Sequence, residues 1–153
     1  LLLDGAKVSG QLLEGSTVSD HLRLVIGIGV NLAHHPQDTP YPATDLQSQL
    51  ITISVASLLC SLCERFDDLL RVWDRGQGFA RIRTMWLERA AYLDREIEMR
   101  SEGRVVKGVF KGIDADGRLL LQPQTATSGG MKTIEAGDFY PLDVIAERSN
   151  KGL

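Results

Sequence analysis

The first 32 residues constrain the fold most, because they hold two short apolar runs rich in leucine, valine and isoleucine. Runs of this length and composition are typical of strands in a mostly buried sheet. A lysine, Lys7, interrupts the first run three residues before Gly10, and the second run, Leu22–Val30, is followed at once by Asn31. A lysine in a buried sheet needs something that compensates its charge. An anionic ligand beside Lys7 would compensate it; the alternative is that Lys7 lies on an edge strand and is solvated.

The N-terminal segment is predicted to form an antiparallel β-meander. Asp4–Gly5 is a two-residue hairpin signal between a strand end at Leu1–Leu3 and a return strand at Ala6–Leu13. The polar segment Glu14–Asp20 is predicted to turn the chain into the next strand, Leu22–Val30. Because the chain opens inside an apolar run without a methionine, we expect it to be the C-terminal part of a longer protein.

A proline-rich loop and two helices are expected next. Ala33–Leu46 holds three of the five prolines and no periodicity, and loops of this length are often functional. From Thr52 onward apolar residues recur at steps of three and four, which predicts a helix that Thr52 or Ser54 caps and that Gly76 and Gly78 end. A second helix is predicted at Phe79–Tyr92, and both helices are expected to cover one face of the sheet.

The remainder of the chain alternates in short runs that predict strands and no helix. Five short strands of this kind suggest a small SH3-like barrel. The predicted fold class is therefore α+β, with residues 1–94 forming a partial mixed or antiparallel sheet covered by helices and residues 95–153 forming the barrel. The predicted strands are Glu96–Arg100, Arg104–Ile113, Leu119–Gln122, Met131–Ile134 and Phe139–Val144, with turns at Glu102–Gly103 and Asp114–Gly117 and a TATSGG loop between the third and fourth strands.

Composition excludes several classes of protein. An apolar content of 43% with 24% charged residues indicates an ordinary globular chain, and no apolar run reaches the roughly 20 residues that a spanning helix needs. The net charge of −3 argues against a general nucleic-acid binder. Two cysteines are too few for a disulfide scaffold, which favours a reducing compartment.

Four motifs invite a functional interpretation, and each has a plainer one. Gly27 and Gly29 follow a strand as in dinucleotide-binding sites, but no third glycine or helix follows, so we expect only a close backbone approach to a ligand. Cys60 and Cys63 form a CxxC pair within an apolar helical stripe, which favours buried structural thiols. His34 and His35 could bind a metal ion, but they lack a third nearby ligand. Asp114 and Asp116 are most simply part of a hairpin turn.

The order of the motifs adds a resemblance to a known family. LLLDGAKVSGQLLEG, VIGIGVNL, ATDL, a helical segment ending in MWLERAAYLDREIEMR, and KGVFKGIDADGRLLL follow one another as in the C-terminal half of the biotin protein ligases. The resemblance covers essentially the whole chain. The glycine- and arginine-rich biotin loop and the K-W-P-N-D segment of that family are absent, as is a DNA-binding region. By this resemblance the chain is a fragment that we expect to be inactive alone.

The resemblance implies roles for seven residues. In the family the lysine of K-x-x-G, here Lys7 with Gly10, contacts biotin and the activated phosphate. The strand glycines, here Gly27 and Gly29, line the biotin and nucleotide pocket. The asparagine after them, here Asn31, contacts the adenylate, and the A-T-x-L segment, here beginning Ala43 and Thr44, lies beside the nucleotide.

The resemblance also implies an activity. The substrates would be ATP, with Mg²⁺, and biotin; the product biotinyl-5′-AMP would pass biotin to a lysine of the biotin carboxyl carrier protein of acetyl-CoA carboxylase, in the cytoplasm. Dimers through strands of this sheet occur in the family, which makes Leu22–Gly29 a candidate edge. Two alternatives stay open: a lipoate or octanoate ligase, which shares the acyl-adenylate chemistry, and a noncatalytic module whose barrel binds a protein.

Overall fold

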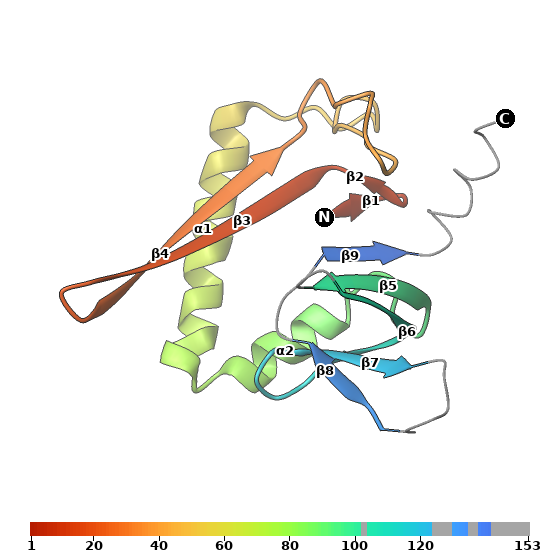
Figure 1. Ribbon diagram of the computed structural model, residues 1–153. Coiled ribbons are helices and arrows are strands. Elements are labelled where there is room, and N and C mark those ends of the chain that lie inside the picture. Colours follow the sequence, from red (N-terminus) through yellow and green to blue (C-terminus); the bar gives the residue numbers. More distant parts are fainter. Residues whose placement is uncertain (102–103, 124–129, 135–137, 142–153) are drawn as a thin grey trace, which may run out of the picture. The chain divides into compact units, whose positions relative to one another are not determined.

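A computed structural model of the chain describes residues 1–101, 104–123, 130–134 and 138–141 (Figure 1). It divides into two compact units, Leu1–Leu62 and Cys63–Leu153, which we describe separately. The division falls within one helix, α1 (Val55–Trp73). It therefore does not test the domain boundary near Asp94, which stays a prediction.

The first unit begins with two hairpins rather than one meander. β1 (Leu2–Leu3) and β2 (Ala6–Lys7) pair across the Asp4–Gly5 turn, which confirms the first predicted hairpin. β3 (Ser9–Val18) and β4 (His21–Val30) form a separate two-stranded sheet. The predicted three-stranded meander is wrong because the chain leaves β2 at Val8, whose N–H donates to the carbonyl of Leu1, before β3 begins.

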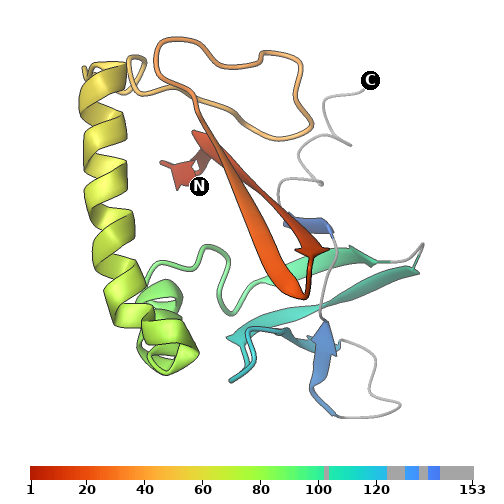
Figure 2. The ribbon, with the colours of Figure 1, turned by 90° about the vertical axis from the view of Figure 1, so that its left-hand side faces the viewer.

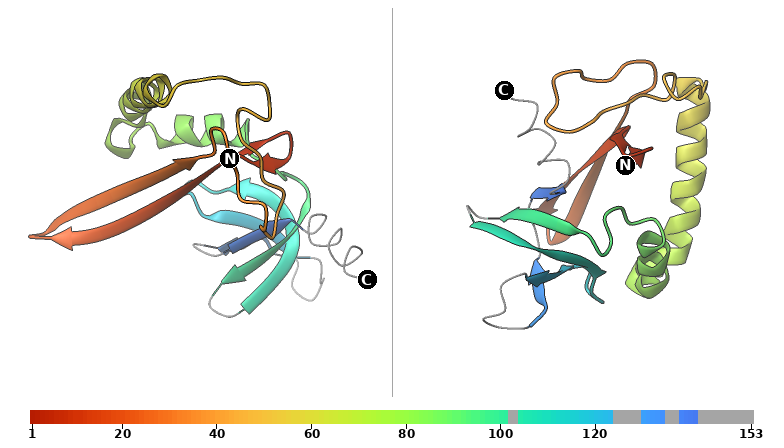
Figure 3. Two further views of the ribbon diagram at one scale, coloured as in Figure 1. Left: turned by 90° about the horizontal axis from the view of Figure 1, so that it is seen from above. Right: turned by 90° about the vertical axis from the view of Figure 1, so that its right-hand side faces the viewer.

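The β3–β4 hairpin is longer than the sequence suggested, and Figure 3 shows it as an extended two-stranded ribbon. The predicted turn at Glu14–Asp20 is wrong: most of this segment continues β3, and only Ser19 and Asp20 turn the chain. Both have positive φ, 50° and 61°, as a two-residue type I′ turn requires. Polar residues can extend these strands because nearly the whole ribbon is exposed.

Exposure of this ribbon corrects the expectation of a mostly buried sheet. Eight large apolar side chains of β3 and β4 are exposed in the described chain: Leu12, Leu13, Val18, Leu22, Leu24, Val25, Ile26 and Ile28. The buried residues of the first unit gather elsewhere, around Lys7. They are Val8, Ser9, Thr44 and Asp45.

The helices begin where the sequence predicts and end earlier. Ser54 caps α1, since its hydroxyl oxygen accepts the N–H of Ser57 at 3.0 Å, and the helix runs unbroken to the short 3₁₀ turn η1 (Asp74–Gly76) (Figure 2). No residue of α1 is buried, so the prediction that Cys60 and Cys63 are buried is wrong. Both are exposed free thiols. That the two helices cover one face of the sheet stays a prediction.

Helix α2 (Phe79–Leu87) is shorter than the predicted Phe79–Tyr92. Tyr92 and Asp94 have positive φ, 63° and 60°, which no helix continues. The N–H of Asp94 instead donates to the carbonyl of Phe110 at 2.8 Å, which leads the chain into the sheet of the second unit.

Five strands form that sheet, in the order β8-β7-β6-β5-β9, with every neighbouring pair antiparallel. They are β5 (Glu96–Ser101), β6 (Arg104–Ile113), β7 (Leu119–Pro123), β8 (Lys132–Ile134) and β9 (Asp138–Pro141). Within the described ranges no pairing joins β8 to β9, so the sheet is open and not a closed barrel. The predicted turn at Glu102–Gly103, the TATSG part of the loop and residues 142–144 of the last predicted strand lie outside the described residues.

The core of the second unit lies on one face of this sheet. It consists of the buried side chains Ile97, Met99, Phe110 and Leu121. Helix α2 packs on β6, where the Trp86 ring meets Phe110 edge to face and Arg83 Nε donates to the carbonyl of Ile113 at 2.7 Å. Asp114 Oδ1 accepts the N–H groups of Asp116 and Arg118, as expected of a hairpin turn. Two helices with antiparallel sheets confirm the α+β fold class.

Candidate functional site

The backbone of Lys7 is held by the proline-rich loop. Its N–H donates to the carbonyl of Pro42 at 2.8 Å, and its carbonyl accepts the N–H of Thr44 at 3.0 Å. Lys7 and Ala43 thereby form a parallel β-bridge. The loop segment that the sequence placed beside the ligand is therefore paired directly with the candidate lysine.

Asn31 ties the end of β4 to the same segment. Its Nδ2 donates to the carbonyl of Thr44 at 2.9 Å and to that of Lys7 at 3.5 Å. The backbone N–H of Asn31 donates to the carbonyl of Val8 at 2.9 Å, and the Asn31 carbonyl accepts the N–H of Leu46 at 3.0 Å. The asparagine thus acts in this structure as a brace between β2, β4 and the loop.

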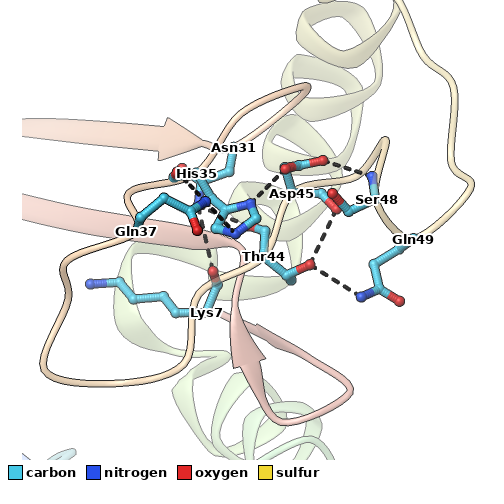
Figure 4. Close-up of polar contacts among 8 residues, drawn as sticks. All are labelled: Lys7, Asn31, His35, Gln37, Thr44, Asp45, Ser48 and Gln49. Atoms are coloured by element: carbon cyan, nitrogen blue, oxygen red, sulfur yellow. Dashed lines mark hydrogen bonds and ion pairs between the residues drawn. The ribbon is translucent and has the colours of Figure 1, made fainter.

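A buried carboxylate completes the brace (Figure 4). Asp45 is 2% exposed; its Oδ1 accepts the N–H of Ser48 at 2.7 Å and its Oδ2 lies 2.6 Å from Nδ1 of His35. The backbone hydrogen bond from Ser48, and then the bond from His35, hold the pKa of Asp45 below its usual value despite its burial. Gln37 in turn contacts the other ring nitrogen of His35 at 3.1 Å.

An open pocket of about 330 Å³ lies beside this brace. Five of the seven predicted site residues line it, namely Lys7, Gly10, Gly29, Asn31 and Ala43. Gly27 lies further along the ribbon, opposite Leu12, and Thr44 is buried behind the pocket, where its peptide groups hold Lys7 and Asn31. Neither belongs to the pocket lining, and the ligand contacts expected of them stay predictions.

Two of the pocket residues are glycines. Gly10 and Gly29 face each other across the β3–β4 pairing. A Cβ added at Gly10 would contact Cε and Nζ of Lys7, at 3.5 and 3.7 Å. These are ordinary van der Waals distances, so a methyl group would fit there, and only a longer side chain at Gly10 would compete with the lysine for this space.

The Lys7 side chain points away from the polar cluster of Asn31, Thr44 and Asp45 (Figure 4). Its Nζ donates to the Tyr41 hydroxyl at 3.0 Å and lies 4.5 Å from the centroid of that ring. No ion pair to Lys7 occurs in the part of the chain that the structure describes. An ammonium group whose hydrogen-bond partner is a neutral phenol is suited to an anionic ligand.

Sequence reasoning missed the pocket residues Ser9, Val30, Pro36, Thr39 and Tyr41. Three of them belong to the loop at 33–46, which was predicted to be functional only as a whole. The PYP sequence at 40–42 was the available signal, because an aromatic residue between two prolines is held in an extended backbone.

The described part of the chain has neither a cluster of metal ligands nor a membrane-spanning helix. Within the described ranges no three His, Cys, Asp or Glu side chains are grouped so that they could hold a metal ion, and this includes His34 and His35. None of the helices in the described part of the chain is long and apolar enough to span a membrane.

Comparison with known proteins gives the geometry a family context. Residues 92–140 match the family described as "Biotin protein ligase C terminal domain". The biotin--[acetyl-CoA-carboxylase] ligase of Paracoccus denitrificans is 35% identical over 150 residues, which are 92% of this chain and 59% of that protein. The bifunctional ligase/repressor BirA of Bacillus subtilis is 27% identical over 90% of this chain and 43% of its own length.

Solved structures agree on the fold. The biotin protein ligase of Aquifex aeolicus matches with a TM-score of 0.72 and 23% identity, over 90% of this chain and 59% of that one. A structure of the same ligase in complex with biotin and ATP matches with a TM-score of 0.71. The chain thus spans about three-fifths of the length of the Paracoccus denitrificans and Aquifex aeolicus ligases. Residues 92–140 match the C-terminal domain of the biotin protein ligases, and the chain as a whole is similar in sequence to the ligases of Paracoccus denitrificans and Bacillus subtilis and in fold to that of Aquifex aeolicus.

Proposed function

We propose that this chain is part of a biotin protein ligase and that its pocket takes part in ATP-dependent activation of biotin. The observation that carries the proposal is the Lys7 ammonium, which lies in a pocket with Gly10 and Gly29 and has no carboxylate partner among the described residues. The names of the relatives support biotin as the substrate, and the Aquifex aeolicus complex supports ATP.

The proposed first step joins biotin to the nucleotide. A biotin carboxylate oxygen attacks the α-phosphorus of ATP, the bond to the β-phosphate oxygen breaks, and pyrophosphate leaves with its electron pair. Negative charge grows on the phosphate oxygens, and an ammonium held in a fixed position stabilises it better than freely reorienting water does. In this proposal Lys7 supplies that charge.

The proposed second step transfers biotin to a protein. The ε-amine of an acceptor lysine attacks the carbonyl carbon of biotinyl-5′-AMP, an amide bond forms, and AMP leaves. The name of the Paracoccus denitrificans relative supports a biotin carboxyl carrier protein of acetyl-CoA carboxylase as the acceptor.

Asn31, Ala43 and Thr44 would contribute chiefly by position. The Thr44 N–H and Asn31 Nδ2 donate to the Lys7 carbonyl, and Ala43 is paired with Lys7 in the β-bridge, so that only the lysine side chain has to be ordered. The described residues do not fit a resident Mg²⁺ site. In the proposal Mg²⁺ arrives on the nucleotide phosphates and this chain supplies no cage for it.

A homodimer and a cytoplasmic location complete the proposal. The apolar side chains exposed on β4, among them Leu24 and Val25, support an edge of that strand as the dimer contact. The free thiols of Cys60 and Cys63 support a reducing compartment. Sedimentation of the complete gene product, with and without Leu24→Glu, tests the dimer.

A thermal-shift titration of the complete gene product tests the activity. Biotin with ATP should raise the melting temperature strongly, since a ligand at 100 times its Kd stabilises by about 2.7 kcal/mol. Lipoate with ATP should not. A response to lipoate instead of biotin would favour a lipoate or octanoate ligase, and no response to either acid would favour a noncatalytic interaction module.

A further inference from the structure

Among the residues that the structure describes, Tyr41 contacts the Lys7 ammonium in two ways. The Tyr41 hydroxyl accepts a hydrogen bond from Nζ at 3.0 Å, and the ring centroid lies 4.5 Å from the same atom. Such a distance to an aromatic face is within the range of a cation–π contact. Both residues line the pocket.

The backbone of Tyr41 is unusually constrained. It lies between Pro40 and Pro42, and a following proline disfavours the helical region for Tyr41. Its carbonyl also accepts the Thr39 hydroxyl at 2.5 Å. Because the Pro42 carbonyl accepts the Lys7 N–H, the same short segment fixes the lysine backbone and presents the ring to the lysine head group.

The chemistry of this partner matters as much as its position. A carboxylate beside Lys7 would also order the side chain, but it would neutralise the ammonium. A phenol and a ring face hold the cation through partial charges only, so the full positive charge stays available to an anion. Ordering the long lysine side chain in advance also removes an entropy cost that the ligand would otherwise meet on binding.

We propose that Tyr41 is a positioning residue, which fixes the Lys7 ammonium in the pocket for a phosphate group of a nucleotide without neutralising it. The identity of that anion rests on the proposed function. The effect of Tyr41 has to pass through Lys7, and this dependence separates the proposal from a general structural role.

Calorimetric titration of the complete gene product with AMP provides the test. Tyr41→Phe, which keeps the ring, should weaken AMP binding about 5-fold, and Tyr41→Ala about 20-fold. In a Lys7→Met background neither change should alter the affinity by more than about 2-fold, because Tyr41 acts through the ammonium. His34→Gln, an exposed change on the same loop outside the pocket lining, should leave the affinity unchanged.

A charged replacement sharpens the test. Tyr41→Glu neutralises Lys7 and should weaken AMP binding more than Tyr41→Gln, which is a polar acceptor of the same length without charge. Three results would overturn the role of Tyr41. The first is equal AMP affinity of Tyr41→Glu and Tyr41→Gln, and the second is an equal loss of AMP affinity from the Tyr41 changes with and without Lys7. The third is no AMP binding by the unaltered protein. An unaltered protein that binds AMP but releases no pyrophosphate with biotin and ATP would instead overturn the proposed function, and the AMP measurements would still decide on Tyr41.

Discussion

Nδ1 of His35 lies 2.6 Å from Oδ2 of Asp45, and Asp45 directly follows Thr44, whose peptide groups hold Lys7 and Asn31. The pair joins the beginning of the proline-rich loop to its end. A buried carboxylate outside the pocket lining thereby supports the position of the candidate lysine.

The stability of this brace should depend on pH through Asp45. Its hydrogen bonds from Ser48 and His35 lower its pKa in the folded chain, so its contribution is complete above the usual carboxyl pKa of about 3.9 and is lost as the pH falls through the lower folded value. We expect Asp45→Asn to melt at a lower temperature than the unaltered protein at pH 7. This gap should shrink as the pH falls below about 4.

Asp38→Asn is the matched control for this experiment. Asp38 is an exposed carboxylate on the same loop, so its replacement should change the melting temperature little at any pH. Melting curves recorded from pH 7 to pH 3 measure both variants. A gap between Asp45→Asn and the unaltered protein that stays constant over this range would argue against the assigned role of the carboxylate.

Asn31→Asp should destabilise the loop more than Asn31→Ala. The aspartate keeps the shape of the side chain but replaces the N–H donor by a carboxylate. This carboxylate would face the carbonyl oxygens of Thr44 and Lys7, which would repel it. Alanine only removes the donor. We expect a loss on the order of 1–3 kcal/mol for Asn31→Asp, measured by urea unfolding. If alanine proved the more harmful replacement, the amide would not be serving as a donor to these carbonyls.

Gly108→Ala should disrupt the sheet of the second unit. A Cβ at this position would lie 2.4 Å from the Gln122 carbonyl oxygen on the neighbouring strand β7, so the pairing of β6 with β7 has to shift. We expect a loss on the order of 1–3 kcal/mol in the free energy of unfolding. Gly130→Ala, which adds a Cβ with no described atom within 4 Å, should be close to neutral in the same assay.

The helix α1 and the second sheet were predictable because local patterns determine them. Ser54 precedes a regular apolar stripe and caps the helix, and the short alternating runs after Asp94 pair in chain order from β5 to β8. The β3–β4 ribbon was misjudged for a physical reason. Its polar tip shows no alternation of apolar and polar residues, because neither face of the ribbon is buried in the described chain. Only the positive φ angles of Ser19 and Asp20 identify the turn.

The candidate site was predictable only in part. The resemblance to the biotin protein ligases indicated Lys7, Gly10, Gly29, Asn31 and Ala43, all of which the fold brings to one pocket. The contact of Lys7 with Tyr41 joins residues 34 positions apart and has no sequence period. Contacts of this kind depend on how a loop folds back on a strand, which spacing alone does not encode.

The role of Lys7 in adenylation is measured by the rate of biotin-dependent pyrophosphate release by the complete gene product. Lys7→Ala should raise the adenylation barrier by on the order of 2.7–4 kcal/mol, as the loss of one preorganised charge-stabilising donor does. Lys7→Arg should restore the rate only in part, because a planar fork replaces a compact charge. An unchanged rate of pyrophosphate release in Lys7→Ala would contradict the account.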